Sequence, residues 1–141
     1  MRCESRRIDR IFDTAPREIR EITRELAEWS ARQGILNGLL TVFIRHTSAS
    51  LLIQENYSPD VRHDLDEFLD RLAPQDPSRY RHNDEGPDDM PAHLKAMLTQ
   101  VTLTIPVIDG KLQLGMWQDV FLLEHRSRPH RRELVVTLIG A

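Results

Sequence analysis

Cysteine is nearly missing from this chain, which has a single one, Cys3, among 141 residues. One cysteine excludes an internal disulfide, and it also excludes a zinc site built from cysteine ligands. Long apolar runs are missing as well, because no stretch is apolar over the length that a membrane-spanning helix needs. The basic residues near the N-terminus are not followed by an apolar segment, so we expect no signal peptide and predict a cytoplasmic protein without a membrane partner.

Broad positive charge is the third feature that the sequence lacks. The formal net charge is -3, whereas binding to nucleic acid depends largely on an excess of lysine and arginine. We therefore predict no nucleic-acid partner. Apolar residues make up 40% of the chain and charged residues 29%, which is ordinary for a globular protein. The length predicts one domain over residues 1–141, built around a single hydrophobic core.

The first strong periodic pattern predicts a helix over residues 15–33. Ile22, Leu26 and Trp29 recur at helical spacing with charged residues between them. Thr14 is a suitable N-cap for this helix, and the glycine at position 34 is a natural stop.

The pattern then changes to strands. Alternating apolar residues predict strands over 38–46 and 49–55, and the short connection at Thr47–Ser48 indicates a hairpin between them. The elements expected after it are a helix from Ser58–Pro59, a polar loop over 75–88, a short helix from Asp89, and strands over 101–107, 112–114, 117–125 and 133–139, with a turn at Asp109–Gly110. This order predicts an α+β fold with antiparallel sheets.

His46 ends the strand expected over 38–46. Because Val42 and Ile44 share its face, its ring should emerge at the edge of the sheet. Position alone leaves two interpretations open, a functional histidine or a buried one satisfied by a backbone carbonyl.

His82 and His93 stand on either side of an acidic segment. Imidazole and carboxylate groups together make a plausible site for a divalent metal, but acidic loops are common and the spacing matches no compact zinc motif. The carboxylates between the two histidines are Asp84, Glu85, Asp88 and Asp89.

The remaining candidate site residues lie at the ends of expected strands and in one expected turn. Glu55 and Glu124 both follow apolar strand residues, and a regular final hairpin would place Gln118 on the same face as Glu124. Such groups either form the floor of a pocket or are inert surface carboxylates. The densest basic cluster consists of Arg126, Arg128, Arg131 and Arg132. It could hold phosphate oxygens through bidentate hydrogen bonds, or it could be a solvated turn that protects a sheet edge.

Several motifs in a fixed order resemble one protein family. They are HTSASL at 46–51, EN at 55–56, VRHD at 61–64, EGPDDMPAHLK at 85–95, PVIDGKLQLGMWQ at 106–118, and EHR at 124–126 followed by RR at 131–132. On these motifs the chain resembles the YjbQ-like family, described as secondary thiamine-phosphate synthase enzymes. The resemblance extends over about residues 34–140, roughly three quarters of the chain.

The resemblance implies an α+β fold built around a β-sandwich with flanking helices, assembled as a homotrimer. It also implies a polar site made of His46, Glu55, Asn56, His82, His93, Gln118 and Glu124. Within that site we expect His46, His82 and His93 to hold a divalent metal, magnesium or zinc. The other four residues would complete the catalytic site, and phosphate would be contacted by Thr47, Ser48, Arg126 and Arg132.

The reaction implied by the resemblance joins hydroxymethylpyrimidine diphosphate to thiazole phosphate and releases pyrophosphate. The departing pyrophosphate needs cations, and the reactive pyrimidine needs a pocket that excludes water. Two alternatives stay open, a metal-dependent hydrolase of a small phosphorylated or amide metabolite and a trimer that binds such a metabolite without turnover. Because a regular hairpin would separate His46 from Glu55, we expect the site to be built between chains.

Overall fold

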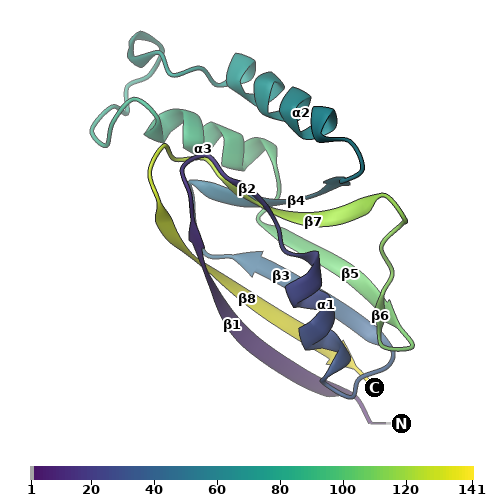
Figure 1. The fold of residues 1–141 in the computed structure, drawn as a ribbon. Coiled ribbons are helices and arrows are strands. Elements are labelled where there is room, and N and C mark those ends of the chain that lie inside the picture. Colours follow the sequence, from purple (N-terminus) through teal and green to yellow (C-terminus); the bar gives the residue numbers. More distant parts are fainter. Residues whose placement is uncertain (1) are drawn as a thin grey trace.

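Two antiparallel sheets face each other in the computed structural model of the chain, which describes residues 2–141 (Figure 1). The five-stranded sheet has the order β1 (Glu4–Thr14), β8 (His130–Gly140), β3 (Gly38–Ile44), β5 (Thr102–Ile108) and β6 (Lys111–Leu112). The three-stranded sheet has the order β2 (Ile19–Glu21), β7 (Gln118–Glu124) and β4 (Ala49–Glu55). The α+β architecture predicted from the sequence is confirmed.

The hydrophobic core lies between the two sheets. Leu40, Val42 and Ile44 alternate along β3 and are at most 1% exposed, as the period of two predicts. Leu51 of β4 and Leu122 of β7 meet them from the facing sheet and are fully buried. Each sheet therefore contributes one apolar face to the same core.

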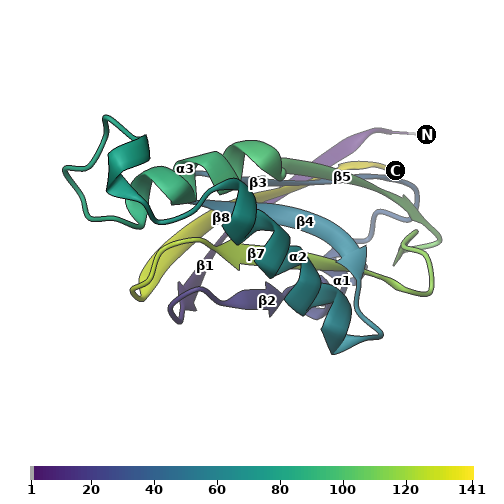
Figure 2. The same cartoon turned by 90° about the horizontal axis from the view of Figure 1, so that it is seen from above.

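Three helices complete the fold: α1 (Thr23–Ala31), α2 (Pro59–Leu72) and α3 (Asp89–Leu98), with a short 3-10 turn at Pro77–Arg79. Figures 1 and 2 show α2 and α3 on the outer side of the three-stranded sheet, while α1 lies beside β6. None of the described helices has the length and apolar character that crossing a membrane requires.

The helix expected over 15–33 is wrong in its first half. Thr14 ends the long strand β1, which we did not expect, and Ile19 pairs with Leu123 in β2. Arg17 between these strands has φ 55°, a left-handed conformation that a helix cannot contain. The helix begins only at Thr23. Charged residues dominate the exposed β1 and dilute the alternation that would have identified it.

The hairpin expected at Thr47–Ser48 does not form. β3 lies between β8 and β5 in one sheet, whereas β4 pairs with β7 in the other, so residues 45–48 cross between the sheets. The final hairpin is absent for the same reason, because β7 and β8 also belong to different sheets.

The turn at Asp109–Gly110 is confirmed: both residues have positive φ, 52° and 75°, and they join β5 to β6.

A buried polar chain joins the three-stranded sheet to α3. The Nε2 atom of His125 lies 2.8 Å from Oγ of Ser50, and the hydroxyl of Thr99, just beyond α3, also contacts that Oγ. Ser50 and His125 are 0% and 5% exposed. Burial lowers the pKa of His125 to about 3, and the positive charge of Lys95 acts in the same direction. His125 is therefore a neutral structural residue at physiological pH.

We expect His125 to make the folding stability depend on pH. Its pKa is lower in the folded chain than the unfolded value of about 6.5, so the stabilisation is complete above that pH and is lost as the pH falls toward 3. Between pH 8 and pH 5 the free energy of unfolding should decrease by about 2 kcal/mol from this residue. Urea denaturation at several pH values, with a chelator present, measures this change.

The control is His125→Gln, which cannot take up the proton. The pKa of His46 is also lowered, chiefly by its burial, so some of the pH dependence should remain in the variant. Charged groups near His125, namely Lys95, Glu124, Arg17 and Arg132, are unchanged by the substitution. An unaltered dependence on pH between 5 and 8 would show that His125 is not the titrating group.

Candidate functional site

Two histidines and one carboxylate converge at the N-terminus of α3. Oδ2 of Asp89 lies 2.7 Å from Nε2 of His82 and 3.1 Å from Nε2 of His93. One ligand atom from each of these residues lies within 4.8 Å of the other two. Asp89 and His93 are four residues apart and so lie on one face of α3, while His82 comes from the preceding loop.

The orientation of His93 is fixed by the backbone. Its Nδ1 lies 2.9 Å from the carbonyl oxygen of Thr47, and since a carbonyl only accepts, Nδ1 must carry the proton. In a neutral imidazole Nε2 is then a bare acceptor, yet it faces the carboxylate of Asp89. Two facing acceptors repel each other unless a proton or a cation lies between them.

Arg126 holds the carboxylate of this cluster in place. Its Nη1 donates to Oδ1 of Asp89 at 2.9 Å, its Nε donates to Asp88 at 2.9 Å, and its Nη2 donates to the carbonyl of Glu85. Burial raises the pKa of Asp89, but the hydrogen bond from His82 and the charges of His93 and Arg126 outweigh it and hold that pKa below its usual value. Asp89 is therefore ionised and oriented, as a metal ligand has to be.

The two arginines expected to bind phosphate are used inside the protein. The side chains of Arg126 and Arg132 are only 7% and 4% exposed. Nε of Arg132 donates to Glu124 at 2.8 Å, and its Nη2 donates to both Glu124 and Oγ of Ser48. Neither guanidinium is free to hold a phosphate, because removing either from its carboxylate would leave a buried charge unpaired. Of the expected phosphate contacts, only the side chain of Thr47 is exposed and free.

Glu124 is likewise bonded inside the protein rather than directed at a substrate. It is 2% exposed and accepts hydrogen bonds from Oγ1 of Thr14 at 2.6 Å and from the backbone N–H of Arg126 at 3.0 Å. Burial raises the pKa of Glu124, but the hydrogen bonds from Arg132 and Thr14 outweigh it and lower that pKa. A carboxylate so fully bonded joins β1, β7 and β8 and does not reach a substrate.

His46 does not join the cluster of His82, Asp89 and His93 within one chain. Its Nε2 accepts a hydrogen bond from the backbone N–H of Glu133 at 2.7 Å, and no nitrogen of His46 belongs to the group formed by His82, Asp89 and His93. Burial, helped by the charge of Arg132, lowers the pKa of His46. The residue is a neutral, half-buried acceptor, and its partner is an N–H rather than the carbonyl considered from the sequence.

The other expected catalytic residues lie at the opposite end of the sheet. Glu55 is paired with Gln118, whereas Ala49, six residues earlier in β4, is paired with Glu124. Six strand residues span about 20 Å, so Glu55 cannot reach the histidines of its own chain. Asn56 donates to two carboxylates there, Gln118 accepts from a backbone N–H, and one oxygen of Glu55 is buried without a partner in the described chain.

Asp89 is the site residue that the sequence interpretation did not select by itself. It was grouped with three other carboxylates of the loop, although its spacing of four residues from His93 would have singled it out on a helix. No local sequence pattern could have predicted that Arg126 binds these carboxylates, because its partners are about 40 residues away in the sequence.

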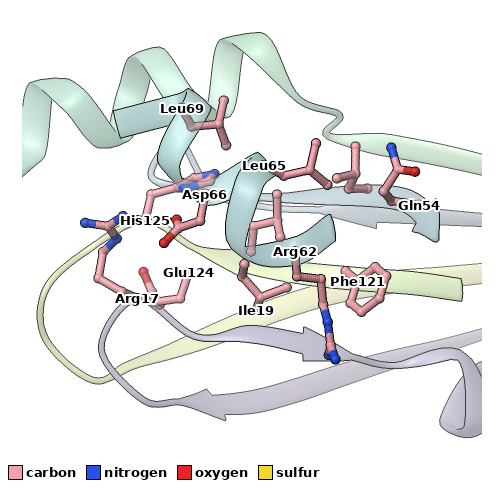
Figure 3. A pocket seen from close by; sticks show the side chains of 12 residues that line it. Arg17, Ile19, Gln54, Arg62, Leu65, Asp66, Leu69, Phe121, Glu124 and His125 are labelled. Carbon is pink, nitrogen blue, oxygen red and sulfur yellow. Dashed lines mark hydrogen bonds and ion pairs between the residues drawn. The ribbon is translucent and has the colours of Figure 1, made fainter. Parts of the chain in front are cut away.

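A separate pocket lies between α2 and the outer face of the three-stranded sheet (Figure 3). Apolar side chains such as Leu65, Leu69 and Phe121 surround a cavity of about 30 Å³, which is room for about one water molecule. At one end, Arg17 donates to Asp66 at 3.1 Å. His82 and His93 do not line this cavity. We interpret it as loose packing beneath α2, none of whose residues is fully buried.

Comparisons with known proteins agree with the motifs. A family model described as UPF0047 protein YjbQ-like matches residues 10–141. A UPF0047 protein of Synechocystis is 57% identical over 107 residues, which cover 76% of this chain and 73% of the relative. The UPF0047 protein YjbQ of Escherichia coli is 45% identical over 103 residues, 73% of this chain and 74% of the relative.

Solved structures show the same fold. A YbjQ-like protein of unknown function from Sulfolobus solfataricus superposes with a TM-score of 0.90 at 25% identity, covering 99% of this chain and 100% of the other. A YjbQ/UPF0047 family protein from Clostridium acetobutylicum gives 0.85 at 30% identity, covering 93% and 98%. The chain belongs to the YjbQ-like UPF0047 family.

Proposed function

We propose that this protein is a metal-dependent enzyme that hydrolyses a small phosphorylated metabolite. The proposal rests on one observation: two imidazoles and one ionised carboxylate, those of His82, His93 and Asp89, converge on a common point. Thr47 and Arg126 orient two of these three groups. Such a donor set leaves coordination positions for water and for a phosphate oxygen.

Zinc fits this donor set better than magnesium. Imidazole nitrogens suit zinc and other transition metals, whereas magnesium prefers oxygen ligands and retains its waters. Of the two metals expected from the sequence, we therefore propose zinc. When bound, the ion would polarise water and neutralise phosphate oxygens. That role falls to the metal because Arg126 and Arg132 are already paired with carboxylates.

The protein residues around the ion would act by holding ligands and admitting water. Asp89 is 1% exposed and fixed by Arg126, so its charge stays in one place. The side chains of His82 and His93 are 42% and 30% exposed, which leaves the site open to water and substrate. Open access favours hydrolysis, in which water is a reactant.

Thiamine-phosphate synthesis remains a proposal for a side activity. The reaction needs a pocket that keeps water from a reactive pyrimidine, and the exposed histidines do not provide such a pocket within one chain. The same metal centre could still hold the pyrophosphate of the diphosphate precursor. We also propose that the protein acts in the cytoplasm, as expected from the sequence.

We further propose that the chain forms a homotrimer through the outer face of its five-stranded sheet. Leu39, Phe43 and Ile139 on that face are 52%, 45% and 51% exposed, and Leu39 pairs directly with Ile139. Neighbouring apolar residues on an open sheet face are typical of an interface. A second chain is also the only source from which Glu55 could reach the histidine cluster, since it is remote in its own chain.

Removing the carboxylate should remove both metal binding and turnover. We expect Asp89→Asn to weaken zinc binding at least about 100-fold, because it deletes a charged ligand, and to abolish phosphate release from a panel of phosphorylated metabolites. Calorimetric zinc titration and a phosphate assay measure the two effects.

The matched control is His63→Ala. His63 lies in another group of possible ligands, with Asp64 and Glu67, but all three residues are exposed on the surface of α2. We expect this variant to bind zinc and release phosphate as the unaltered protein does. Zinc binding or turnover that survived in Asp89→Asn, or failed in His63→Ala, would contradict the proposed site.

A direct comparison separates hydrolysis from synthesis. Given hydroxymethylpyrimidine diphosphate together with thiazole phosphate, the zinc-loaded protein should release phosphate or pyrophosphate faster than it forms thiamine phosphate, because water reaches the open site. Chromatography of the products measures both rates. Synthesis that exceeded the hydrolysis of every phosphorylated compound tested would make the transferase the main function and overturn the hydrolase.

A charge on the apolar sheet face should dissociate the trimer. We expect Phe43→Arg to give a folded monomer, because an arginine in the interface would have to lose its hydration without a partner. Light scattering after size-exclusion chromatography measures the mass. Phe68→Arg on α2, where the phenylalanine is 50% exposed, should leave the mass unchanged. A monomeric parent protein, or a trimeric Phe43→Arg variant, would contradict this interface.

A further inference from the structure

An open pocket of about 220 Å³ lies at the end of the three-stranded sheet that is remote from the metal cluster. Its lining residues are Asn56, Tyr57, Met116, Trp117 and Asp119. The rings of Tyr57 and Trp117 are 4.9 Å apart and inclined at 69°, an edge-to-face pair. Tyr57, Trp117 and Met116 are 74%, 53% and 85% exposed, so these large side chains are not part of the core.

The walls of this pocket are held together by the backbone. The N–H of Asn56, just after β4, donates to the carbonyl oxygen of Trp117, just before β7, at 3.0 Å. The two aromatic residues therefore stand on neighbouring segments whose backbone spacing is fixed without a ligand. A preformed pocket avoids the cost of ordering its walls on binding.

Two carboxylates beside the aromatic pair lack a cationic partner. The side-chain amide of Asn56 donates to Glu21 at 2.7 Å and to Asp119 at 2.9 Å. No lysine, arginine or histidine among residues 2–141 forms an ion pair with either carboxylate. The side-chain amide of Asn56 thus holds the carboxylates of Glu21 and Asp119 close together beside the pocket. No cationic side chain of the described residues neutralises either of them.

Aromatic faces and free carboxylates together favour one class of ligand. The face of a tryptophan or tyrosine ring attracts cations, and most effectively cations whose alkyl groups make the loss of water cheap. Met116 adds a soft apolar surface for such groups. A bare metal ion fits less well, because the groups able to hold one among the described residues lie elsewhere.

We propose that this pocket binds a small organic cation of the quaternary or alkylated ammonium class. The cationic head would lie against Trp117 and Tyr57, and Asp119 and Glu21 would balance its charge. The pocket is complete in one chain, so the inference rests neither on the proposed metal centre nor on the proposed trimer.

The test compares a cation with a neutral molecule of the same shape. Choline and 3,3-dimethylbutanol are titrated into the full chain, with tryptophan fluorescence and calorimetry as readouts. Of the two tryptophans, Trp29 is buried, so a fluorescence change would report Trp117. We expect choline to bind at least about tenfold more tightly than the neutral analogue, and its affinity to fall as salt is added.

Variants test the two parts of the pocket separately. Trp117→Leu and Tyr57→Leu should each weaken choline binding about tenfold, and Asp119→Asn should weaken it while reducing its dependence on salt. Phe68→Leu, another exposed aromatic residue, should have no effect. Equal binding of both molecules, no saturation by choline in the tens of millimolar, or full binding in both leucine variants would overturn the proposal.

Discussion

The buried guanidinium of Arg126 is the group on which the arrangement of the candidate site depends. A charge placed in the interior is stable only when its hydrogen bonds are satisfied, and Arg126 finds its partners in Asp88, Asp89 and the carbonyl of Glu85. These contacts fasten the polar loop and the first turn of α3 to the end of β7. Burial of one arginine thus fixes the carboxylate around which two histidines gather.

A second buried ion pair acts in the same region. Arg132 and Glu124 join β8 to β7, one from each sheet, and Thr14 of β1 donates to the same carboxylate. The sheets are therefore linked by charge at the end where His82, Asp89 and His93 gather, and by apolar packing along the rest of their length. The opposite end carries uncompensated carboxylates and exposed aromatic rings instead. The two ends of the same strands thus differ in chemistry, because the carboxylates at one end are paired with arginines, whereas those at the other end contact only the amide of Asn56.

The sequence predicted much of the fold and only part of the site. The alternation that identified the inward residues of β3 is a local property, as is the glycine turn after Asp109, and both were confirmed. The spacing of Asp89 and His93 is also local. His46 was expected to join His82 and His93, but it lies apart from them and accepts from the backbone of Glu133 instead. That contact joins residues 87 positions apart, a distance at which no spacing rule applies.

The sequence by itself determined which side chains of β3 face the core, where the polar loop lies, and to which family the chain belongs. It did so because side-chain periodicity and motif order are properties of neighbouring residues. Only the tertiary structure decided that β3 and β4 enter different sheets, and that Arg126 and Arg132 turn inward to carboxylates rather than outward to phosphate. Strand partners and ion pairs are chosen by the burial and charge of distant segments, which meet only when the chain has folded.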